Sequence, residues 1–262
     1  MPTSTIPAGD EFTLDIVAPH LEGFEPPVEP WDPQADGRLT YGIYTLAMRG
    51  ARLGTLGMSR RSLGDGTVSL TVDYDKAVPG NHRQKMAAEI VCRTDAISTP
   101  LRWQFTSKTV APGGKTIAGT RWTKSGRVVD GGLEMTDARS TRRVALPEAH
   151  TVNWALFDAV MRLPRRPFDP IHFALVDHFD QVKPAHRLSY RKTVDVVFPS
   201  PASPKTETGP ASKAPRARPL RLHGYDQLGH GMVPWVWWVD DRGRLLFAVS
   251  GLEAYLYERA EG

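Results

Sequence analysis

The sequence predicts a mainly β protein in which a single strongly bent antiparallel sheet, a half-barrel meander, wraps around one buried α-helix. Three observations favour this fold class: short alternating segments separated by turns, one helical segment that is apolar almost all round, and a closing hairpin rich in tryptophan. The chain has 262 residues, which is enough to bury a sizeable core as one β domain.

Strands are expected wherever polar and apolar residues alternate, because successive side chains of a strand point to opposite faces. Residues 67–74 (TVSLTVDY) alternate without a break. Turn-forming residues such as those at 77–82 (AVPGNH) recur every ten or so positions, which is typical of an antiparallel meander. On this basis we expect strands at residues 39–48, 53–60, 67–74, 84–92, 101–105, 116–123, 127–135, 171–176 and 187–198.

One helix is expected, at residues 150–163. Thr151 is a suitable N-cap, and Pro147 and Pro164 bracket the segment. Its apolar residues go almost all round, which is typical of a helix buried on every side.

The closing hairpin turns at residues 240–243, where Gly243 can adopt the left-handed conformation that a tight reversal demands. Trp235, Trp237 and Trp238 precede the turn and carry too much apolar area to be left in water. Since Trp237 and Trp238 are consecutive, we expect them on opposite faces of the sheet.

Two segments lie outside this pattern. Residues 1–37 are rich in proline and are expected to form an extended N-terminal arm. Residues 38–262 are expected to form a single β domain with a disordered Pro/Ser/Ala/Lys-rich insertion at 199–219. Three aromatic residues are expected to pin the arm: Phe12, Phe24 and Trp31.

Composition argues against several classes of protein. No apolar run approaches the roughly 20 residues that span a bilayer. Of the formal net charge of +4, +3 lies in residues 199–220, so the rest of the chain is nearly neutral and no nucleic-acid partner is expected. Cys92 is the single cysteine and is expected to be a structural residue in an apolar strand. Residues 1–14 show no signal-peptide pattern, which predicts a cytoplasmic protein, or a periplasmic or envelope protein if an export signal was removed.

Three segments in this order suggest a family: YGIYTLAMRGARLGTLGMSRR (residues 41–61), FDAVMRLP (157–164) and WWVDDRGRLLFAVSG (237–251). The arrangement resembles DUF3108-like and LolA/LolB-like lipoprotein-type proteins, in which a bent antiparallel sheet wraps around a helix. This chain departs from them in lacking a lipobox cysteine near its N-terminus and in its proline-rich arm and insertion. The resemblance implies an envelope-associated protein with a concave apolar cavity, and it implies no reaction.

The leading hypothesis is therefore a non-catalytic protein that binds a small apolar or amphipathic ligand in the concave face of the sheet, without a cofactor. His223 and Tyr225 are expected at the rim of the binding site. Its expected lining consists of Trp154, Phe157, Met161, Trp235, Trp237 and Phe247.

The alternative hypothesis is a carbohydrate-active enzyme, a lyase or hydrolase acting on a glycan. A His/Tyr pair with a nearby cation suits β-elimination, because a neutral base can take the proton α to a uronate carboxylate that the cation neutralises. The candidate catalytic residues are His223, Tyr225, His178 and Arg191, with Arg187 as a second choice for the cation. A metal-dependent enzyme would need three of five histidines to converge: His172, His178, His186, His223 and His230.

Overall fold

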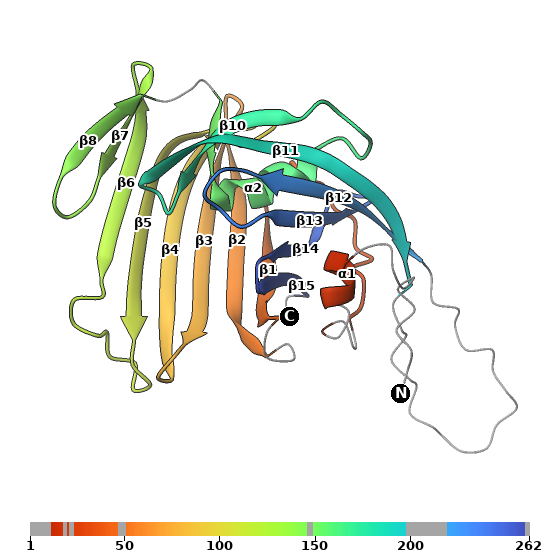
Figure 1. Ribbon diagram of the computed structural model, residues 1–262, viewed down its shortest axis with the longest axis horizontal. Coiled ribbons are helices and arrows are strands. Elements are labelled where there is room, and N and C mark those ends of the chain that lie inside the picture. Colours follow the sequence, from red (N-terminus) through yellow and green to blue (C-terminus); the bar gives the residue numbers. More distant parts are fainter. Residues whose placement is uncertain are drawn as a thin grey trace, which may run out of the picture.

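The structure is a computed structural model that describes residues 12–17, 20, 24–46, 51–145, 149–197 and 219–259. It confirms the predicted fold class, because one large sheet of 15 strands, mostly antiparallel and not closed, curves around helix α2 (Asn153–Ala159) (Figure 1). Two other short helical segments are α1 (Phe12–Val17) and the 3₁₀ turn η2 (Val160–Arg162). The strands are β1 (Gly37–Thr45), β2 (Arg52–Gly64), β3 (Thr67–Val78), β4 (His82–Arg93), β5 (Pro100–Val110), β6 (Trp122–Val129), β7 (Gly132–Thr136), β8 (Thr141–Ala145), β9 (His150–Val152), β10 (Ile171–Asp177), β11 (Gln181–Val196), β12 (Leu220–Leu228), β13 (Trp235–Asp240), β14 (Leu245–Ser250) and β15 (Glu253–Glu258). None of the helices among these residues is long and apolar enough to cross a membrane.

The strand order forces the sheet to curl. It runs β8-β7-β6-β5-β4-β3-β2-β1-β15-β14-β13-β12-β11-β10-β9, so the two edge strands are consecutive in the chain. Ala145 ends β8 and His150 begins β9, and the five peptide steps between them can span at most about 18 Å. The edges therefore have to approach each other. β9, which pairs in parallel with β10, lies against the loop that leads into β5, where Thr151 Oγ1 donates a hydrogen bond to the Ile97 carbonyl at 2.7 Å.

The predicted helix is shorter than residues 150–163. Residues 150–152 form β9, α2 covers 153–159, and η2 follows. Thr151 is thus a strand residue and not the N-cap, and the actual cap position, Val152, makes no side-chain capping hydrogen bond. The β-branched Thr151 and Val152 suit a strand. The prediction of a buried helix is confirmed, because Ala155, Leu156, Phe157 and Ala159 are all buried.

Two strand predictions need correction. Residues 127–135 are not one strand but the β6–β7 hairpin, which reverses at Asp130 and Gly131, both with positive φ. This Asp-Gly pair is a typical hairpin turn that the alternation pattern conceals. Residues 116–121 are not a strand, and only Thr116 forms a single bridge, to Val110. The expected insertion at 199–219 lies outside the described residues except for Pro219.

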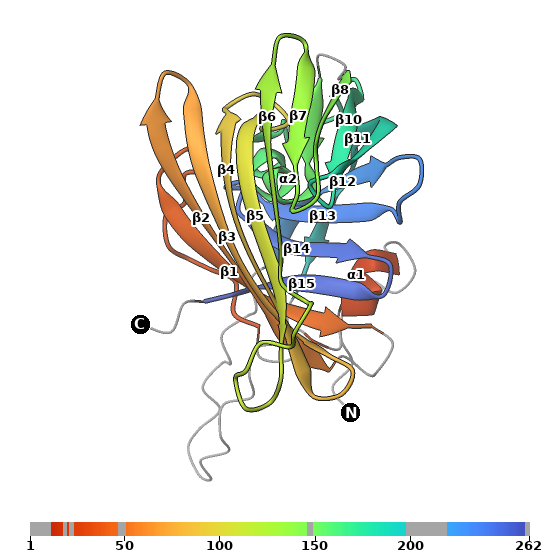
Figure 2. The same ribbon diagram turned by 90° about the vertical axis from the view of Figure 1, so that its left-hand side faces the viewer.

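The closing hairpin separates two apolar clusters, one on each face of β13–β15. Gly243 has the expected positive φ of 83°. Trp237 packs into the cluster that contains α2, whereas Trp238 packs into a second cluster with Leu14 and Val17 of α1, as predicted for consecutive residues. Figure 2 shows α2 inside the curve of the sheet and α1 beside β14 and β15.

The N-terminal arm contributes to both clusters. The Phe24 ring lies 5.3 Å from that of Phe247 on the α1 side. Trp31 packs on the α2 side, with the Arg244 guanidinium 5.2 Å from its ring centroid. The side chain of Phe12 lies outside the described part of the chain.

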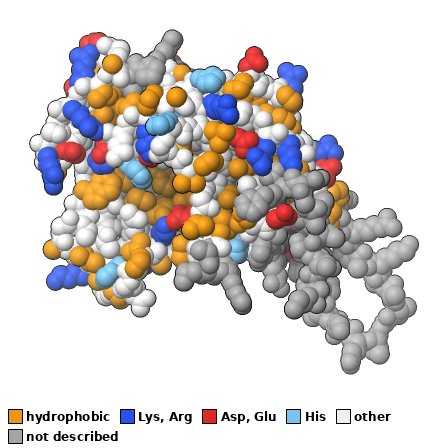
Figure 3. All heavy atoms as spheres, viewed as in Figure 1, with side chains coloured by type: hydrophobic (Ala, Val, Ile, Leu, Met, Phe, Trp, Pro, Cys, Tyr) orange, Lys and Arg blue, Asp and Glu red, His pale blue; other side chains and the backbone are white. Residues whose placement is uncertain are grey.

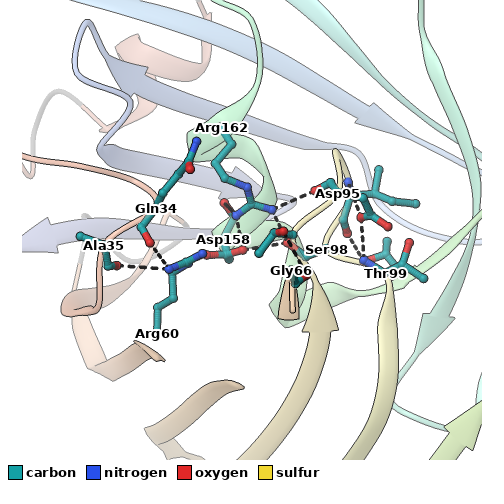
Figure 4. Close-up of polar contacts among 12 residues, drawn as sticks. Gln34, Ala35, Arg60, Gly66, Asp95, Ser98, Thr99, Asp158 and Arg162 are labelled. Atoms are coloured by element: carbon teal, nitrogen blue, oxygen red, sulfur yellow. Dashed lines mark hydrogen bonds and ion pairs between the residues drawn. The ribbon is translucent and has the colours of Figure 1, made fainter. Parts of the chain in front are cut away.

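A buried ion-pair network fixes α2 inside the sheet (Figure 4). Asp158 is 2% exposed and pairs with Arg60 of β2 at 3.2 Å and with Arg162 of η2. Arg162 also donates to Ser98 Oγ and to the Asp95 carbonyl, at 2.8 and 2.9 Å, in the loop between β4 and β5. The network therefore ties the helix to two separate parts of the sheet.

Candidate functional site

A cavity of about 270 Å³ lies beside α2, between strands β3–β6 and the opposite wall formed by β10, β13 and β15. Figure 3 shows a hollow with a hydrophobic floor on this face, with charged and histidine side chains at its margin. Eight of its lining residues are aromatic: Tyr74, Phe105, Trp122, Trp154, Phe157, Phe179, Trp235 and Tyr255. The others are Gln84, Met86, Asn153, Val176, His178 and Glu253.

Phe157 of α2 is the centre of this aromatic wall. Its ring meets Trp237 edge to face at 4.9 Å and Tyr255 at 5.6 Å. Trp235 in turn stacks on Trp237 at 4.9 Å and on Tyr255 at 5.5 Å. Such pairs add about 0.5–1.5 kcal/mol each beyond burial, so the wall is held in place before any ligand arrives.

One end of the cavity is polar. The Glu253 carboxylate pairs with the Lys76 ammonium and accepts a hydrogen bond from the Tyr255 hydroxyl at 3.3 Å. Burial raises the pKa of Tyr255 well above its usual value, and the pKa of Tyr74 is raised for the same reason. Both phenols are therefore neutral hydrogen-bonding groups at physiological pH.

The turn between β10 and β11 closes the cavity on another side. His178 and Phe179 both have positive φ, 49° and 63°, which is uncommon for residues other than glycine. The Phe179 ring stacks on Phe105 of β5 at 4.6 Å. The Lys124 ammonium of β6 pairs with Asp180 at 2.5 Å and donates to the His178 carbonyl at 3.0 Å. The strained turn is thus attached to the far wall of the sheet, and residues held in such conformations often have functional roles.

Asp177, the last residue of β10 before this turn, is also paired. Asp177 accepts hydrogen bonds from Lys183 Nζ at 2.6 Å and Asn153 Nδ2 at 2.9 Å. Burial acts to raise the pKa of Asp177, but the Lys183 hydrogen bond, His178 and Asn153 together bring it below its usual value. Asp177 therefore remains ionised and holds Asn153 at the cavity wall.

The structure brings together half of the predicted lining residues. Trp154, Phe157 and Trp235 line the cavity. Met161 and Trp237 lie in the same apolar cluster, but Met161 faces a void of only 20 Å³ and Trp237 is 1% exposed. Phe247 belongs to the α1-side cluster, on the opposite face of the sheet.

The four candidate catalytic residues do not converge. Tyr225 is buried and its hydroxyl donates to the Pro164 carbonyl at 3.2 Å, while burial raises its pKa. Arg191 pairs with Asp226 at 2.8 Å, and Asp226 follows Tyr225 in β12 and so points to the opposite face. His178 lies in the turn three residues before β11 and lines the cavity, whereas His223 is paired in register with Thr193 near the far end of that strand. From Gln181, the first residue of β11, to Thr193 there are twelve residue steps, roughly 40 Å of strand.

His223 has a structural environment. Its Nδ1 lies 2.8 Å from Thr193 Oγ1 and its Nε2 lies 2.8 Å from Asp241 Oδ1, so it joins β11 to the closing turn. Among the described residues, no three His, Cys, Asp or Glu side chains are grouped so that they could hold a metal ion. The five histidines considered for a metal site are all described and are not so grouped.

Two larger hollows, of about 560 and 630 Å³, lie on the outward face of β1–β7. Their linings include Arg38, Asp73, Lys85, Arg102 and Arg127, which are charged and solvent-exposed. They are open troughs on a polar sheet face, whereas small-molecule sites are mostly apolar and enclosed. The smaller aromatic cavity is therefore the better candidate site.

Several lining residues were not predicted from the sequence. Tyr74 and Phe105 fall in segments that alternate polar and apolar residues, which is a signal for burial but not for a cavity. Phe179 and Trp122 carry no such signal, because one lies in a turn and the other in a segment with weak alternation. Asp177, His178 and Asp180 mark the end of the preceding strand in the sequence, but they do not indicate that Phe179 lines a cavity.

Comparison with known proteins supports the fold. No protein-family model and no curated protein matches this sequence. Among solved structures, the chain is similar to one described as "Crystal Structure of Beta-barrel-like Protein of Domain of Unknown Function DUF1849 from Brucella abortus", with a TM-score of 0.51 and 10% sequence identity over 85% of this chain and 94% of that one. The resemblance to DUF3108-like and LolA/LolB-like proteins is not confirmed by these comparisons. At 10% identity, the structural similarity establishes a shared fold alone.

Proposed function

We propose that this protein binds a small apolar or amphipathic ligand in the aromatic cavity beside α2 and does not transform it. The observation that carries the proposal is the lining itself, in which eight aromatic side chains surround about 270 Å³. This volume is close to the lower end of the range for small-molecule sites, which are typically 300–1,000 Å³, apolar and largely preformed. The dispersed positions of His223, Tyr225, His178 and Arg191 give no comparable support to the glycan-enzyme alternative.

Titration with an uncharged two-ring fluorophore such as naphthalene-2-methanol tests this proposal. Met86→Trp places a large ring in the cavity, since Met86 is a half-buried lining residue of β4. Ala87→Trp places the same ring on the outward face, because Ala87 is exposed and adjacent in the strand. We expect saturable binding to the natural sequence and to Ala87→Trp, and at least tenfold weaker binding to Met86→Trp.

The outcomes separate clearly. Equal binding to both variants would place the ligand outside the cavity. The absence of binding to the natural sequence, for this probe and for ionised apolar probes alike, would contradict the proposed function.

The resemblance to DUF3108-like and LolA/LolB-like proteins adds an envelope location to the proposal. Cell fractionation tests that addition independently of ligand binding. We expect the protein in the periplasmic or membrane-associated fraction, and its recovery in the cytosol alone would remove the envelope location without affecting the cavity.

A further inference from the structure

We infer that the ligand is an uncharged, compact apolar molecule of about two fused rings, rather than an organic anion, an organic cation or a sugar. This inference rests on the proposed function and specifies its ligand class. Three properties of the cavity support it: the pairing of its charges, the occupation of its ring faces and its size.

The first property is the pairing of ionised groups around the cavity. Glu253, at the polar end, pairs with Lys76 and accepts the Tyr255 hydrogen bond. At the turn, Asp180 pairs with Lys124. A charged ligand would therefore have to remain unpaired against an aromatic wall or disrupt an existing pair, and both cost free energy.

A third ion pair lies next to Asn153, a lining residue, and joins Asp177 to Lys183. His178 is the remaining titratable side chain on the lining besides Glu253 and the two tyrosines, and it is 72% exposed in its turn. Each carboxylate near the cavity is thus neutralised by a lysine, so a ligand meets neither a net positive nor a net negative charge.

The second property is the occupation of ring faces by neighbouring protein groups. Cations and sugars bind aromatic rings across their faces. Trp235 already stacks on Trp237 and Tyr255, and Phe105 on Phe179. The face of Trp122 carries the Lys124 ammonium at 4.6 Å from its centroid. These occupied faces disfavour an ammonium ligand and a stacked sugar ring.

The third property is size. An apolar cavity of about 150 Å³ is known to hold benzene. The present cavity, at about 270 Å³, has room for roughly twice that volume. A long acyl chain would not fit inside, whereas a bicyclic compound would fill the space and contact ring edges, Met86 and Val176.

The test uses three probes of one shape: naphthalene-2-methanol, naphthalene-2-carboxylate and naphthalen-2-ylmethylammonium. Isothermal titration calorimetry of the full chain measures each dissociation constant. We expect the uncharged alcohol to bind at least tenfold more tightly than either ion. Equal or tighter binding of an ion would overturn this inference while leaving the proposed function standing. Failure of all three probes to bind would overturn both.

Two matched variants sharpen the test by removing one partner of the Lys76–Glu253 pair. Lys76→Met leaves the Glu253 carboxylate unpaired, so binding of the ammonium probe should strengthen about tenfold. Glu253→Gln leaves Lys76 unpaired, so binding of the carboxylate probe should strengthen instead. The alcohol should change less than threefold in both. If neither variant changed the dissociation constant of either ion, charge pairing would not select the ligand, and the inference would be overturned.

Discussion

The two helices lie on opposite faces of the same strands and are held there by different means. α1 packs through Leu14 and Val17 onto a closed apolar cluster, and Trp238 Nε1 donates to Thr13 Oγ1 at 3.0 Å. α2 is fixed through the charged side chain of Asp158, and a cavity remains beside it. The comparison shows that a helix of seven residues can be positioned firmly without covering the whole concave face of a large sheet.

The two consecutive tryptophans of β13 also differ in their surroundings. Trp238 lies over Gly224, where an added Cβ would come within 2.7 Å of the indole ring. Trp237 instead faces α2, and its Nε1 has no hydrogen-bond partner within the described part of the chain. Trp238 is therefore packed against the backbone of the neighbouring strand, whereas Trp237 leaves a buried donor without a partner among the described residues.

The largest effect is expected from Asp158→Ala, which would leave Arg60 and Arg162 buried beside each other. Breaking a buried ion pair in this way costs about 3–5 kcal/mol. Urea denaturation should report this loss in the free energy of unfolding. Asp73→Ala is the control, because its pair with Arg38 is long, at 3.7 Å, and exposed, so the change should be at most about 0.5 kcal/mol. Similar losses in both variants would mean that α2 is not held by the network.

Gly224→Ala should have the next largest effect. The new methyl group would collide with Trp238, and overpacking of this kind costs about 1–3 kcal/mol. Gly113→Ala is the matched control, since an added Cβ there meets nothing within 4 Å. Binding of the uncharged probe should be unchanged in Gly224→Ala. A loss of binding without a loss of stability would place the ligand on the α1 side.

Thr13→Val should destabilise the α1 side by about 1 kcal/mol, because it removes an acceptor from a buried indole N–H. The measurement is again the free energy of unfolding in urea. Asp15→Ala, at an exposed position of the same helix, is the control and should be near neutral. An unchanged stability in Thr13→Val would show that apolar contacts alone hold α1.

The smallest expected effect is a change in how the stability of the folded protein depends on pH, and it involves His186 of β11. His186 is fully buried, and burial together with the Lys183 charge lowers its pKa. The unfolded chain takes up a proton near pH 6.5, whereas the folded protein resists it. The stability contribution of neutral His186 is therefore complete above about pH 6.5 and is lost as the pH falls toward the folded pKa.

His186→Leu should consequently reduce the difference in Tm between pH 7.5 and pH 5.5. His172→Gln, at an exposed position of β10, should preserve that difference. An undiminished pH dependence in His186→Leu would assign the effect to other groups.

Sequence patterns predicted most of the sheet, because the alternation of polar and apolar residues along a strand reflects which face is buried. They did not predict β8 or β9, and they merged the β6–β7 hairpin into one strand. The alternation at residues 67–74 corresponds to β3, and the adjacent Trp237 and Trp238 do face opposite clusters. The cavity was less accessible, since Tyr74 and Phe105 would show the same alternation in a filled core. It depends on the length of α2, which is shortened because residues 150–152 pair with β10. It also depends on Phe179, whose positive φ in a turn without glycine has no sequence signal.

The most direct measurement is a crystal structure with a brominated two-ring alcohol, in which anomalous scattering locates the bromine. We expect one strong peak in the cavity, in contact with Trp154, Phe157 and Trp235. A peak found only in the troughs on the outward face, or on the α1 side of β13–β15, would contradict ligand binding beside α2.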